Sequence, residues 1–480
     1  MLLTTPRNYQ SNDVQLMHEN DARYLGYDMG CGKSLPVVAY IDQYRPKMSL
    51  ILCPKPVVPV WPKEFKKHLG KDMEVLVVPL DRKPGKKTTM SGKQKLELMR
   101  EKWKAADKAG WPIVFILNHE SARMEPMASA LTGVKKNWDL AVIDEIHKCK
   151  NPSGTSGRFI GKLGKKADKR VGLSGTPMPH SPLDIWAQFR FLDKKIFGWN
   201  FNKFKSEHTI MDPNGFWAHG KPVQILRYKN LENLNKKFYS IATRVTKDEV
   251  LDLPEATHLE RFLDPDAATK KAYKEMHDNL VTEVKGEDCV AANAMVKVTR
   301  LQQITSGFVK TDAGVELALH ELKKREIVNI MNDLDPKEPV CFFCRFHWDL
   351  RAVESAAEEL DRPFYGLWSG RDDVDACWKP KPGGMLAAQV SSGSVGIDLT
   401  TSTYNVYVSQ TWNMGEYDQS LSRSHRHGQE RPVFYIHLLM RDSVDEKIRA
   451  ALAKRAELID TTLSQSEFNE MILDSYRKDS

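Results

Sequence analysis

A glycine-rich segment near the start of the chain carries residue types that can hold phosphate groups. In LGYDMGCGKS, the residues Gly30, Cys31 and Gly32 precede Lys33 and Ser34, and the helix-like sequence LPVVAYIDQY follows. The backbone N–H groups and dipole of a helix N-terminus can surround phosphate oxygens, while a lysine reaches the outer phosphates and a serine hydroxyl binds magnesium. The strict GxxxxGK pattern has glycine at position 27, where this chain has tyrosine, so an ordinary glycine turn is the alternative.

An acidic pair further along the chain can complete such a site. The apolar sequence DLAVID ends at Asp144, and Glu145 follows directly. Ligands bind at the C-terminal ends of the strands in open parallel sheets, so Asp144 can hold magnesium and Glu145 can orient and deprotonate an attacking water molecule. An acidic pair after a strand is also a common solvated turn, but here it follows the glycine-rich segment in the order that phosphoryl transfer requires.

Short apolar runs predict the elements that must position these residues. Continuous apolar runs separated by helix-length segments are typical of parallel strands covered by helices on both faces. The first group of runs is SLILC, IVFIL, DLAVID and RVGLSG, and the second is PVCFF, MLAAQV, YNVYVS and VFYIHLL. The sequence therefore predicts an α/β protein with two lobes in series.

The region between the two groups has a helical pattern. From about residue 183 to residue 333, apolar residues lie three and four apart, as in LDIWAQFRFLDKK and LENLNKKFYSIATRV. We expect an N-terminal lobe at 1–250 with a helical protrusion from about 183, a helical insertion at 251–333 and a C-terminal lobe at 334–480. The length of 480 residues agrees with more than one domain.

Composition limits the class of protein. Hydrophobic residues make up 41% and charged residues 28% of the chain, which is ordinary for a globular protein. No apolar run approaches the roughly 20 residues that span a bilayer, and MLLTTPRNYQ lacks the features of a signal peptide, so we expect an intracellular protein without a membrane partner. The net charge of +8 suits a polyanionic partner without requiring one.

Other features have structural as well as functional interpretations. Cys341 and Cys344 form a CxxC inside PVCFFCRF without a second Cys or His pair at metal spacing, which favours a buried strand over a zinc or redox site. The basic stretches DRKPGKKTTMSGKQK, at 81–95, and GRFIGKLGKKADKR, at 157–170, are each either a nucleic-acid contact or a solvated surface.

The motifs resemble those of the Snf-type (Swi/Snf-like) ATPases of helicase superfamily two. DMGCGKS resembles the family's DMGLGKT, and Asp144-Glu145-Ile146-His147 resembles its DEAH-type box. The segments PRNYQ, CPKPVVPVWPKEFKKH, ILNHES, LSGTPMPHSPLDIW and RVTKDEVLDLPE stand in the family's order around them. The resemblance covers nearly the whole chain. It implies two tandem RecA-like lobes, ATP and Mg²⁺ as cofactors, and recognition of the adenine edge by Gln10.

The second lobe carries the most specific of these matches. QSLSRSHRHGQERPVFYIHLL, from Gln419, closely matches the family's QAxGRxHRxGQ signature, and Gln419 is assigned to the coupling machinery. The resemblance implies that Arg423 and Arg426 stabilise the charge that develops in phosphoryl transfer, so that hydrolysis depends on closure of the lobes. As isolated residues, these arginines would be surface groups in weak ion pairs.

Further assignments come from the same resemblance. Ser174 and Thr176 resemble the third motif, which links the phosphate site to the opposite face, although SGTP could equally be a tight turn. The motifs that begin at Pro54, Asn118 and Ser391 imply contacts to DNA phosphates, which carry no sequence information. The residues with suitable donors there are Lys55, Ser121, Ser392 and Thr400.

The chain departs from the family pattern at several positions. Asp398 replaces an asparagine, Ser394 a glycine, Cys31 a leucine and Ile146 an alanine. None of these changes removes a group expected to touch phosphate, magnesium or water. The change at Asp398 could retune a nucleic-acid contact.

The resemblance implies an ATP hydrolase that moves on duplex or branched DNA, with DNA favoured over RNA. We expect a compact bacterial or phage-type form that acts in DNA repair, recombination or replication, cytoplasmic in a bacterial or phage-infected cell and nucleoid-associated when bound to DNA. The alternatives are a strand-separating helicase on forked DNA or RNA, a motor subunit of a restriction or defence complex, and a non-enzymatic ATP-gated clamp.

Overall fold

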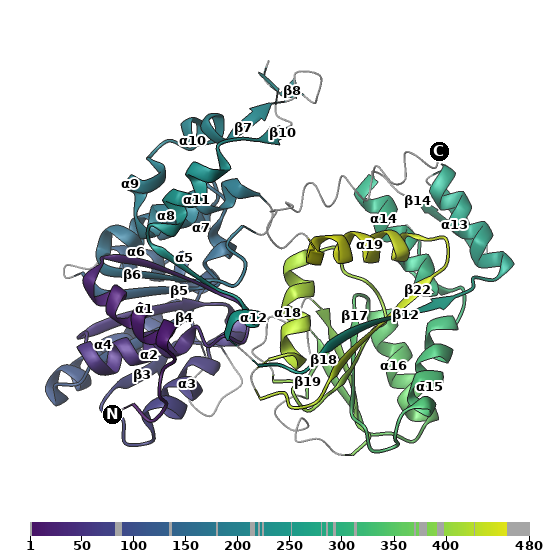
Figure 1. Ribbon diagram of the computed structural model, residues 1–480, viewed down its shortest axis with the longest axis horizontal. Helices are drawn as coiled ribbons and strands as arrows, with labels where there is room; N and C mark the ends of the chain where they lie inside the picture. The colour runs from purple at the N-terminus through teal and green to yellow at the C-terminus, as the bar shows by residue number, and fades with distance from the viewer. Residues whose placement is uncertain are drawn as a thin grey trace. The chain divides into compact units, whose positions relative to one another are not determined.

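The chain folds into two compact units that divide between Val250 and Leu251 (Figure 1). The computed structural model describes residues 2–81, 89–133, 137–178, 181–211, 217–218, 221–222, 225–250, 252–279, 281–284, 287–290, 294–311, 314–368, 371–373, 382–390, 398–426 and 428–457. Among these residues, no helix is both long enough and apolar enough to cross a membrane.

The described residues of the first unit form a seven-stranded sheet in which every neighbouring pair is parallel. Its strands, in sheet order, are β11 (Ala242–Val245), β1 (Ala22–Tyr27), β6 (Ala167–Leu173), β5 (Trp138–Asp144), β2 (Met48–Cys53), β4 (Ile113–Asn118) and β3 (Leu76–Pro79). Because the strands are parallel, their carboxyl ends meet along one edge, and the segments that follow these ends are brought together there.

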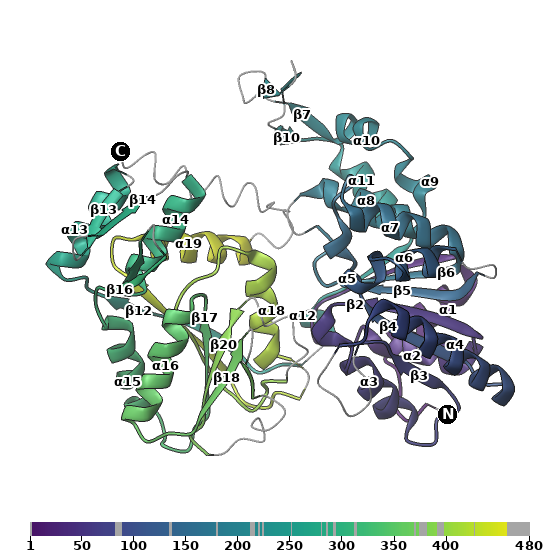
Figure 2. The same ribbon diagram turned by 180° about the vertical axis from the view of Figure 1, so that it is seen from behind.

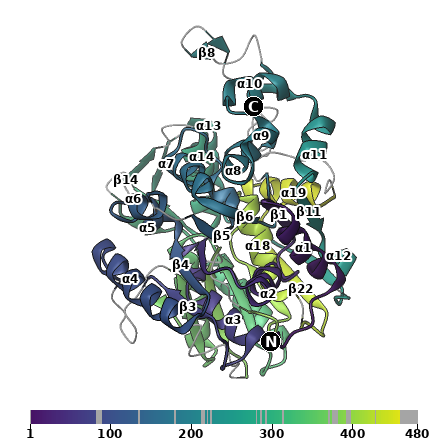
Figure 3. The same cartoon turned by 90° about the vertical axis from the view of Figure 1, so that its left-hand side faces the viewer.

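Helices cover both faces of this sheet (Figures 1 and 3). The helices that pack in succession on one face are α1 (Asn8–Glu19), α2 (Ser34–Tyr44) and α3 (Val60–Leu69). The helices whose apolar residues share a core with the other face include α4 (Gly92–Ala109), α5 (His119–Arg123), α6 (Met127–Thr132), α7 (Thr155–Leu163) and α8 (Ile185–Leu192). The sheet is therefore a buried layer, which explains why β2, β4, β5 and β6 read as continuous apolar runs.

The rest of the first unit follows α8. Its helices are α9 (Lys194–Phe197), α10 (Phe201–His208), α11 (Leu231–Tyr239) and α12 (Lys247–Val250). Between them lie the short strands β7 (Thr209–Met211), β8 (Trp217–Ala218), β9 (Lys221–Pro222) and β10 (Ile225–Tyr228). Phe197, Phe204 and Phe238 are buried and join these helices to the core of the unit.

The described residues of the second unit form another seven-stranded sheet, which is parallel except for its last pair. Its strands, in sheet order, are β12 (Ala256–Leu263), β22 (Val433–Met440), β21 (Tyr404–Tyr407), β17 (Val340–Cys344), β20 (Met385–Gln389), β18 (Phe364–Trp368) and β19 (Arg371–Asp372). The shorter strands are β13 (Val281–Val284), β14 (Glu287–Val290), β15 (Phe308–Lys310) and β16 (Glu316–Ala318).

Two helical layers enclose the second sheet. The layer that Figure 2 shows beside β17, β18 and β20 consists of α15 (Leu322–Asp333) and α16 (His347–Glu359). The helices that share a core with the other face are α13 (Ala267–Asn279), α14 (Ala294–Thr305), α18 (Met414–Ser424) and α19 (Val444–Glu457). The prediction of two tandem α/β lobes is confirmed, and all eight apolar runs are strands.

The middle of the chain differs from the prediction in two places. Residues 242–245, expected to continue a helix, form β11 and extend the first sheet beside β1. Residues 251–333, expected to be a helical insertion, belong to the second unit, because β12 pairs with β22 along its whole length. The interpretation of the CxxC as a buried strand is confirmed, since Cys341 and Cys344 are fully buried in β17.

Candidate functional site

The glycine-rich segment forms a turn from the carboxyl end of β1 into the N-terminus of α2. Gly30 and Gly32 have φ angles of 90° and 72°, in the left-handed region that favours glycine. Lys33 is the N-cap residue of α2, and its Nζ lies 3.1 Å from the carbonyl oxygen of Tyr27 and 3.3 Å from that of Asp28. The lysine side chain therefore lies over the turn, with the first N–H groups of the helix beside it.

Tyr27 stands at the position where the strict pattern has glycine, and its side chain points away from this turn toward α1. Its hydroxyl donates a hydrogen bond of 2.5 Å to Oδ2 of Asp13 in α1, and its ring meets that of Tyr9 edge-on at 5.2 Å. Asp13 is fully buried and also binds Arg23 and Thr243. The irregular residue thus joins the strand to a helix, and the two glycines alone supply the unusual backbone angles.

The start of α1 holds the turn in place. The amide of Gln10 donates from Nε2 to the carbonyl oxygens of Gly32, at 3.1 Å, and Cys31, at 3.4 Å, and Oε1 accepts from the backbone N–H of Arg7 at 2.8 Å. The Tyr9 hydroxyl donates to the same Cys31 oxygen at 2.9 Å. Cys31 is buried, and burial raises the pKa of its thiol to about 11, so it acts through its backbone. Recognition of adenine by Gln10 stays a prediction.

The acidic pair lies at the carboxyl end of β5. Asp144 is the last residue of the strand, and Glu145 has a φ of 52°, which is unusual for a residue other than glycine. Burial and the adjacent Glu145 carboxylate raise the pKa of Asp144, and Lys33 is close enough to oppose this shift. The lysine of the turn and the two carboxylates therefore form one electrostatic cluster.

Helix α3 contacts both sides of this cluster. Trp61 donates from Nε1 to Oδ2 of Asp144 at 3.2 Å, and Glu64 accepts a hydrogen bond from the Ser34 hydroxyl. Burial alone would raise the pKa of Glu64, but hydrogen bonds from His68 and Ser34 lower it to about 2, so this carboxylate is ionised.

The SGTP segment, at the carboxyl end of β6, reaches both the acidic box and the glycine-rich turn. Nδ1 of His147 lies 2.8 Å from the Ser174 hydroxyl oxygen and 3.2 Å from Oε2 of Glu145. Ser174 also accepts the backbone N–H of Thr176 at 3.1 Å, so the segment is a tight turn as well as a link. A side chain at Gly175 would meet the Tyr27 carbonyl oxygen at 3.2 Å and Lys33 Nζ at 3.5 Å.

Arg244 and Asp28 were missed by sequence reasoning. Arg244, at the end of β11, forms an ion pair of 2.7 Å with Asp28 and donates to the carbonyl oxygens of Gly26 and Gly175. Asp28 also accepts the backbone N–H of Lys247 in α12 at 3.2 Å. The exit from the first unit is therefore tied to the glycine-rich turn. The RVTKDEVLDLPE segment stands in the family's order, but nothing in its sequence identifies the partner of Arg244.

The DNA-contact candidates of the first unit lie at the same edge of the sheet. Lys55 is exposed after β2, and Ser121 follows β4 in α5. Lys95, from the basic stretch at 81–95, is buried and donates to the Ser121 hydroxyl at 2.8 Å. Burial lowers its pKa, Asp81 opposes this shift, and Lys55 adds to it. Residues 82–88 of that stretch lie outside the described residues. Lys95 is a positive group beside the predicted contacts that its sequence context alone did not single out.

The basic stretch at 157–170 has a structural part and an exposed part. Lys169 donates to the carbonyl oxygens of His18 and Asn20, and Arg170 to that of Asp21, at the start of β6. These two residues therefore join β6 to the turn before β1, at the opposite edge of the sheet from the acidic pair. Arg158 and Lys162 are exposed on α7, where a nucleic-acid contact stays a prediction.

In the second unit, Gln419 and Arg423 lie on α18 and are mostly buried. Arg426 follows the helix, and its Nε is buried without a hydrogen-bond partner among the described residues. Gln429 fixes this segment by donating to the carbonyl oxygens of Thr400, at 2.8 Å, and Ser424, at 3.2 Å. The predicted coupling and arginine positions are therefore held in one short segment.

The remaining DNA-contact candidates are Thr400 and Ser392. The hydroxyl and the backbone N–H of Thr400 both donate to Oδ1 of Asp398, at 2.8 and 3.1 Å. Asp398 stands where the family pattern has asparagine. It accepts a hydrogen bond from the Thr400 hydroxyl, the group predicted to contact a DNA phosphate. Ser392 and Ser394 lie outside the described residues.

Comparison with known proteins identifies the family. The SNF2-related domain matches residues 9–308, which is more than half of the chain. The chain belongs to the SNF2-related family. An ATP-dependent helicase of Mycoplasma pneumoniae is 23% identical over 96% of this chain, and the chain spans only 42% of that relative. Protein p41 of Acyrthosiphon pisum secondary endosymbiont phage 1 is 24% identical over 92% of this chain and 95% of its own length.

A solved structure also aligns with the chain. The Sulfolobus solfataricus SWI2/SNF2 ATPase core in complex with dsDNA aligns over 99% of this chain and 97% of its own, with 21% identity and a TM-score of 0.43.

The residues of this SNF2-related chain fit a magnesium ion bound together with a nucleotide. Magnesium prefers oxygen ligands and is usually held by one or two protein groups, with water and substrate phosphates completing its shell. Ser34 and Asp144 offer one hydroxyl and one carboxylate, and α3 contacts both. The described residues contain no cluster of three or more His, Cys, Asp or Glu side chains that could hold a metal alone.

Proposed function

We propose that this chain is an ATP-driven motor that moves on duplex or branched DNA. The observation that carries the proposal is the convergence of three elements at one edge of the first sheet: the glycine-rich turn, the acidic pair and the Ser174 turn. Membership of the SNF2-related family and the helicase name of a relative agree with it. In this proposal the residues that bind ATP are Gln10, Gly30, Cys31, Gly32, Lys33 and Ser34.

Each charged group has a distinct task in hydrolysis. Lys33 holds the outer phosphates, Ser34 and Asp144 hold magnesium, and Glu145 orients the attacking water and accepts its proton. Bound magnesium supplies positive charge to the phosphate oxygens. Arg423 and Arg426 add the last positive charges when the second lobe closes on the nucleotide, so that ATP turnover requires closure.

The coupling path uses contacts already present in the first unit. Glu145 is joined through His147 to Ser174, and the segment of Ser174 and Thr176 lies against the turn that holds Lys33. The backbone of DNA is held mainly by phosphate contacts, for which Lys55 and Ser121 provide donors. We propose further contacts from Ser392 and Thr400, and coupling by Gln419.

We further propose that the motor acts in DNA repair, recombination or replication, in the cytoplasm of a bacterial or phage-infected cell and on the nucleoid when bound to DNA. The phage relative, 95% of whose length this chain covers, supports the phage-type setting, and the DNA process rests on the resemblance to Snf-type ATPases.

The test compares ATPase rates with single-stranded, duplex, forked and four-way DNA and with RNA. We expect duplex or four-way DNA to stimulate turnover most, and binding to weaken with salt at a log-log slope of about −0.9 per phosphate contacted. Displacement of an oligonucleotide would indicate a strand-separating helicase instead. A DNA-independent ATPase that is insensitive to salt would contradict the motor.

A further inference from the structure

Two side chains on one face of α3 contact the two candidate magnesium ligands. Trp61 and Glu64 are three residues apart, so they lie next to each other on the helix surface. Trp61 donates to the Asp144 carboxylate, and Glu64 accepts from the Ser34 hydroxyl. The two ligands come from different elements, β5 and α2, and α3 is the element that contacts both side chains.

Both contacting side chains are themselves fixed. Trp61 is 2% exposed and packs beside Phe65, which is fully buried. Glu64 lies 3.5 Å from Nε2 of His68, whose Nδ1 in turn lies 2.8 Å from the Thr4 hydroxyl. Because their own neighbours hold them, Trp61 and Glu64 present their polar atoms in fixed places, as outer-shell partners of metal ligands do.

The direction of each hydrogen bond suits metal binding. A hydroxyl that binds a cation must offer a lone pair, so its proton has to point elsewhere, and Glu64 is the acceptor that takes it. The Trp61 N–H uses one lone pair of the Asp144 carboxylate, at Oδ2, and a carboxylate has further lone pairs that an ion can use. Each bond therefore orients its ligand without using the lone pair that magnesium needs.

We infer that Trp61 and Glu64 are positioning residues of the magnesium site, and that α3 sets the spacing between Ser34 and Asp144. The inference rests on the proposed function, because it assumes that this site binds ATP with magnesium. It assigns no catalytic step to either residue. α3 begins three positions after the Lys55–Val57 turn, so the candidate DNA contact Lys55 lies a short distance along the chain from this helix.

The test measures the affinity of a fluorescent, non-hydrolysable ATP analogue as magnesium is varied. Trp61→Phe keeps a ring but removes the N–H, and Glu64→Leu keeps a similar shape but removes the acceptor. Magnesium should tighten binding of the analogue. We expect each variant to raise the magnesium concentration that gives half of this effect by about 10-fold, as outer-shell changes do at other metal sites. Affinity in excess EDTA should be unchanged, because Lys33 and the turn are intact. Glu64→Gln, which keeps an acceptor oxygen, should recover part of the loss.

Trp138→Phe is the matched control. Trp138 is a buried tryptophan of the same unit, and its N–H donates to the Leu131 carbonyl oxygen at 3.0 Å, away from the acidic pair. The affinity of Trp138→Phe for the analogue should depend on magnesium as that of the wild type does. Wild-type dependence in Trp61→Phe and Glu64→Leu, or an equal change in Trp138→Phe, would overturn the inference alone. A wild-type chain that binds no nucleotide would overturn the proposed function, and the inference with it.

Discussion

Arg426 is partly buried just after α18. Its Nε has no hydrogen-bond partner among the described residues, whereas Arg431, five positions later, forms a half-exposed ion pair with Glu338. The Arg426 Nε is therefore a donor that an incoming group can meet, which agrees with the role proposed for the arginine signature.

The first prediction concerns Arg426→Ala. If this side chain meets the nucleotide only when hydrolysis occurs, the change should lower kcat by about 10³-fold and alter ATP affinity much less. Steady-state kinetics and analogue binding measure the two effects separately. Arg431→Ala is the control and should leave both nearly unchanged. Equal losses of affinity and turnover in Arg426→Ala would make this arginine a nucleotide-binding residue only.

At the scale of single residues, the sequence singled out Lys33, Asp144, Glu145 and Ser174 by their motifs, and the parallel sheet brings the segments that carry them to one edge. It could not predict that Trp61 reaches Asp144 or that Arg244 reaches Asp28, because these pairs lie far apart in the chain. The first contact depends on how α3 lies against the sheet, and the second on the pairing of β11 with β1.

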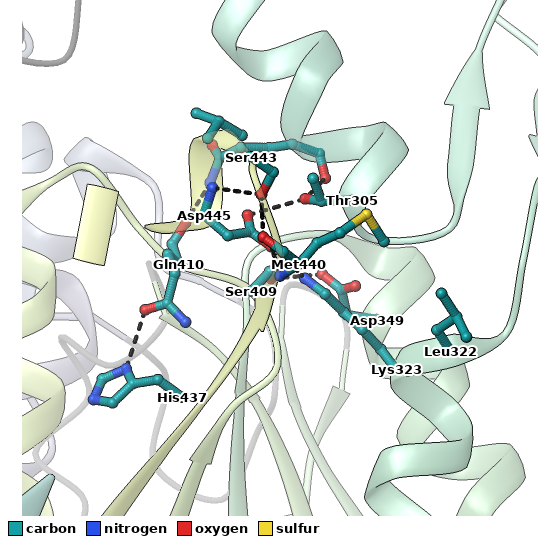
Figure 4. Close-up of polar contacts among 12 residues, drawn as sticks. Thr305, Leu322, Lys323, Asp349, Ser409, Gln410, His437, Met440, Ser443 and Asp445 are labelled. Carbon is teal, nitrogen blue, oxygen red and sulfur yellow. Dashed lines mark hydrogen bonds and ion pairs between the residues drawn. The ribbon is translucent and has the colours of Figure 1, made fainter. Parts of the chain in front are cut away.

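At the scale of elements, a buried ion pair joins the helices of the second unit. Lys323 of α15 lies 3.3 Å from Asp445 in the first turn of α19, and their side chains are 3% and 1% exposed (Figure 4). Asp445 also accepts from the Thr305 hydroxyl of α14 at 2.9 Å. One carboxylate thus connects three helices in an apolar region, where an uncompensated charge is costly.

We predict that Lys323→Met lowers the free energy of unfolding by about 3–5 kcal/mol, because Asp445 stays buried without its cation. Lys324→Met is the control. Lys324 pairs at 3.0 Å with Glu359, whose side chain is 52% exposed, and such a pair contributes about 0–1 kcal/mol. Urea denaturation of the full chain measures both. Equal losses for the two variants would show that the buried pair has no special role.

A pair of histidines joins the edge strand β12 to β22. Nδ1 of His258 lies 3.2 Å from Nε2 of His437, which is fully buried. Burial, Arg449 and His258 lower the pKa of His437. An acidic group near Arg449 is Glu260, at 3.1 Å. The buried His437 ring is therefore neutral in the folded protein near pH 7.

This pair predicts a pH dependence of stability. Below about pH 6.5 the unfolded His437 gains a proton that the buried, folded residue does not accept, so the unfolded state binds more protons as the pH falls. Stability should therefore fall as the pH is lowered from 7 to 4. His437→Gln should flatten this dependence, as measured by urea midpoints at several pH values. Parallel profiles for the wild type and the variant would contradict the assignment.

Two of the strands that the sequence did not predict, β1 and β12, have polar residues for identifiable reasons. β1 contains Arg23, whose charge is matched by the buried Asp13 of α1, so a fully buried strand does not read as an apolar run. β12 lies at the edge of its sheet and is largely exposed, which allows the polar sequence ATHLERFL. A single sequence shows neither a neutralising partner nor an edge position.

At the scale of the whole molecule, the chain is two α/β units that divide between Val250 and Leu251, with proposed catalytic residues in both. The first unit carries the residues proposed to bind the nucleotide, and its exit segment contacts the glycine-rich turn through Asp28. On the other side of the junction, the Pro254 carbonyl oxygen lies 2.8 Å from Nε2 of His425, inside the arginine signature. Each end of the junction thus contacts the segment that carries the proposed catalytic residues of its own unit.

We propose that Glu145 accepts the proton of the attacking water in a DNA-stimulated ATPase. The most direct measurement is steady-state ATP turnover with and without duplex DNA, for the wild type and for Glu145→Gln. We predict that DNA increases the wild-type rate and that Glu145→Gln abolishes steady turnover with both DNA and ATP analogue still bound, because only the proton acceptor is lost. Wild-type turnover in Glu145→Gln, or a wild-type rate that DNA leaves unchanged, would contradict the account.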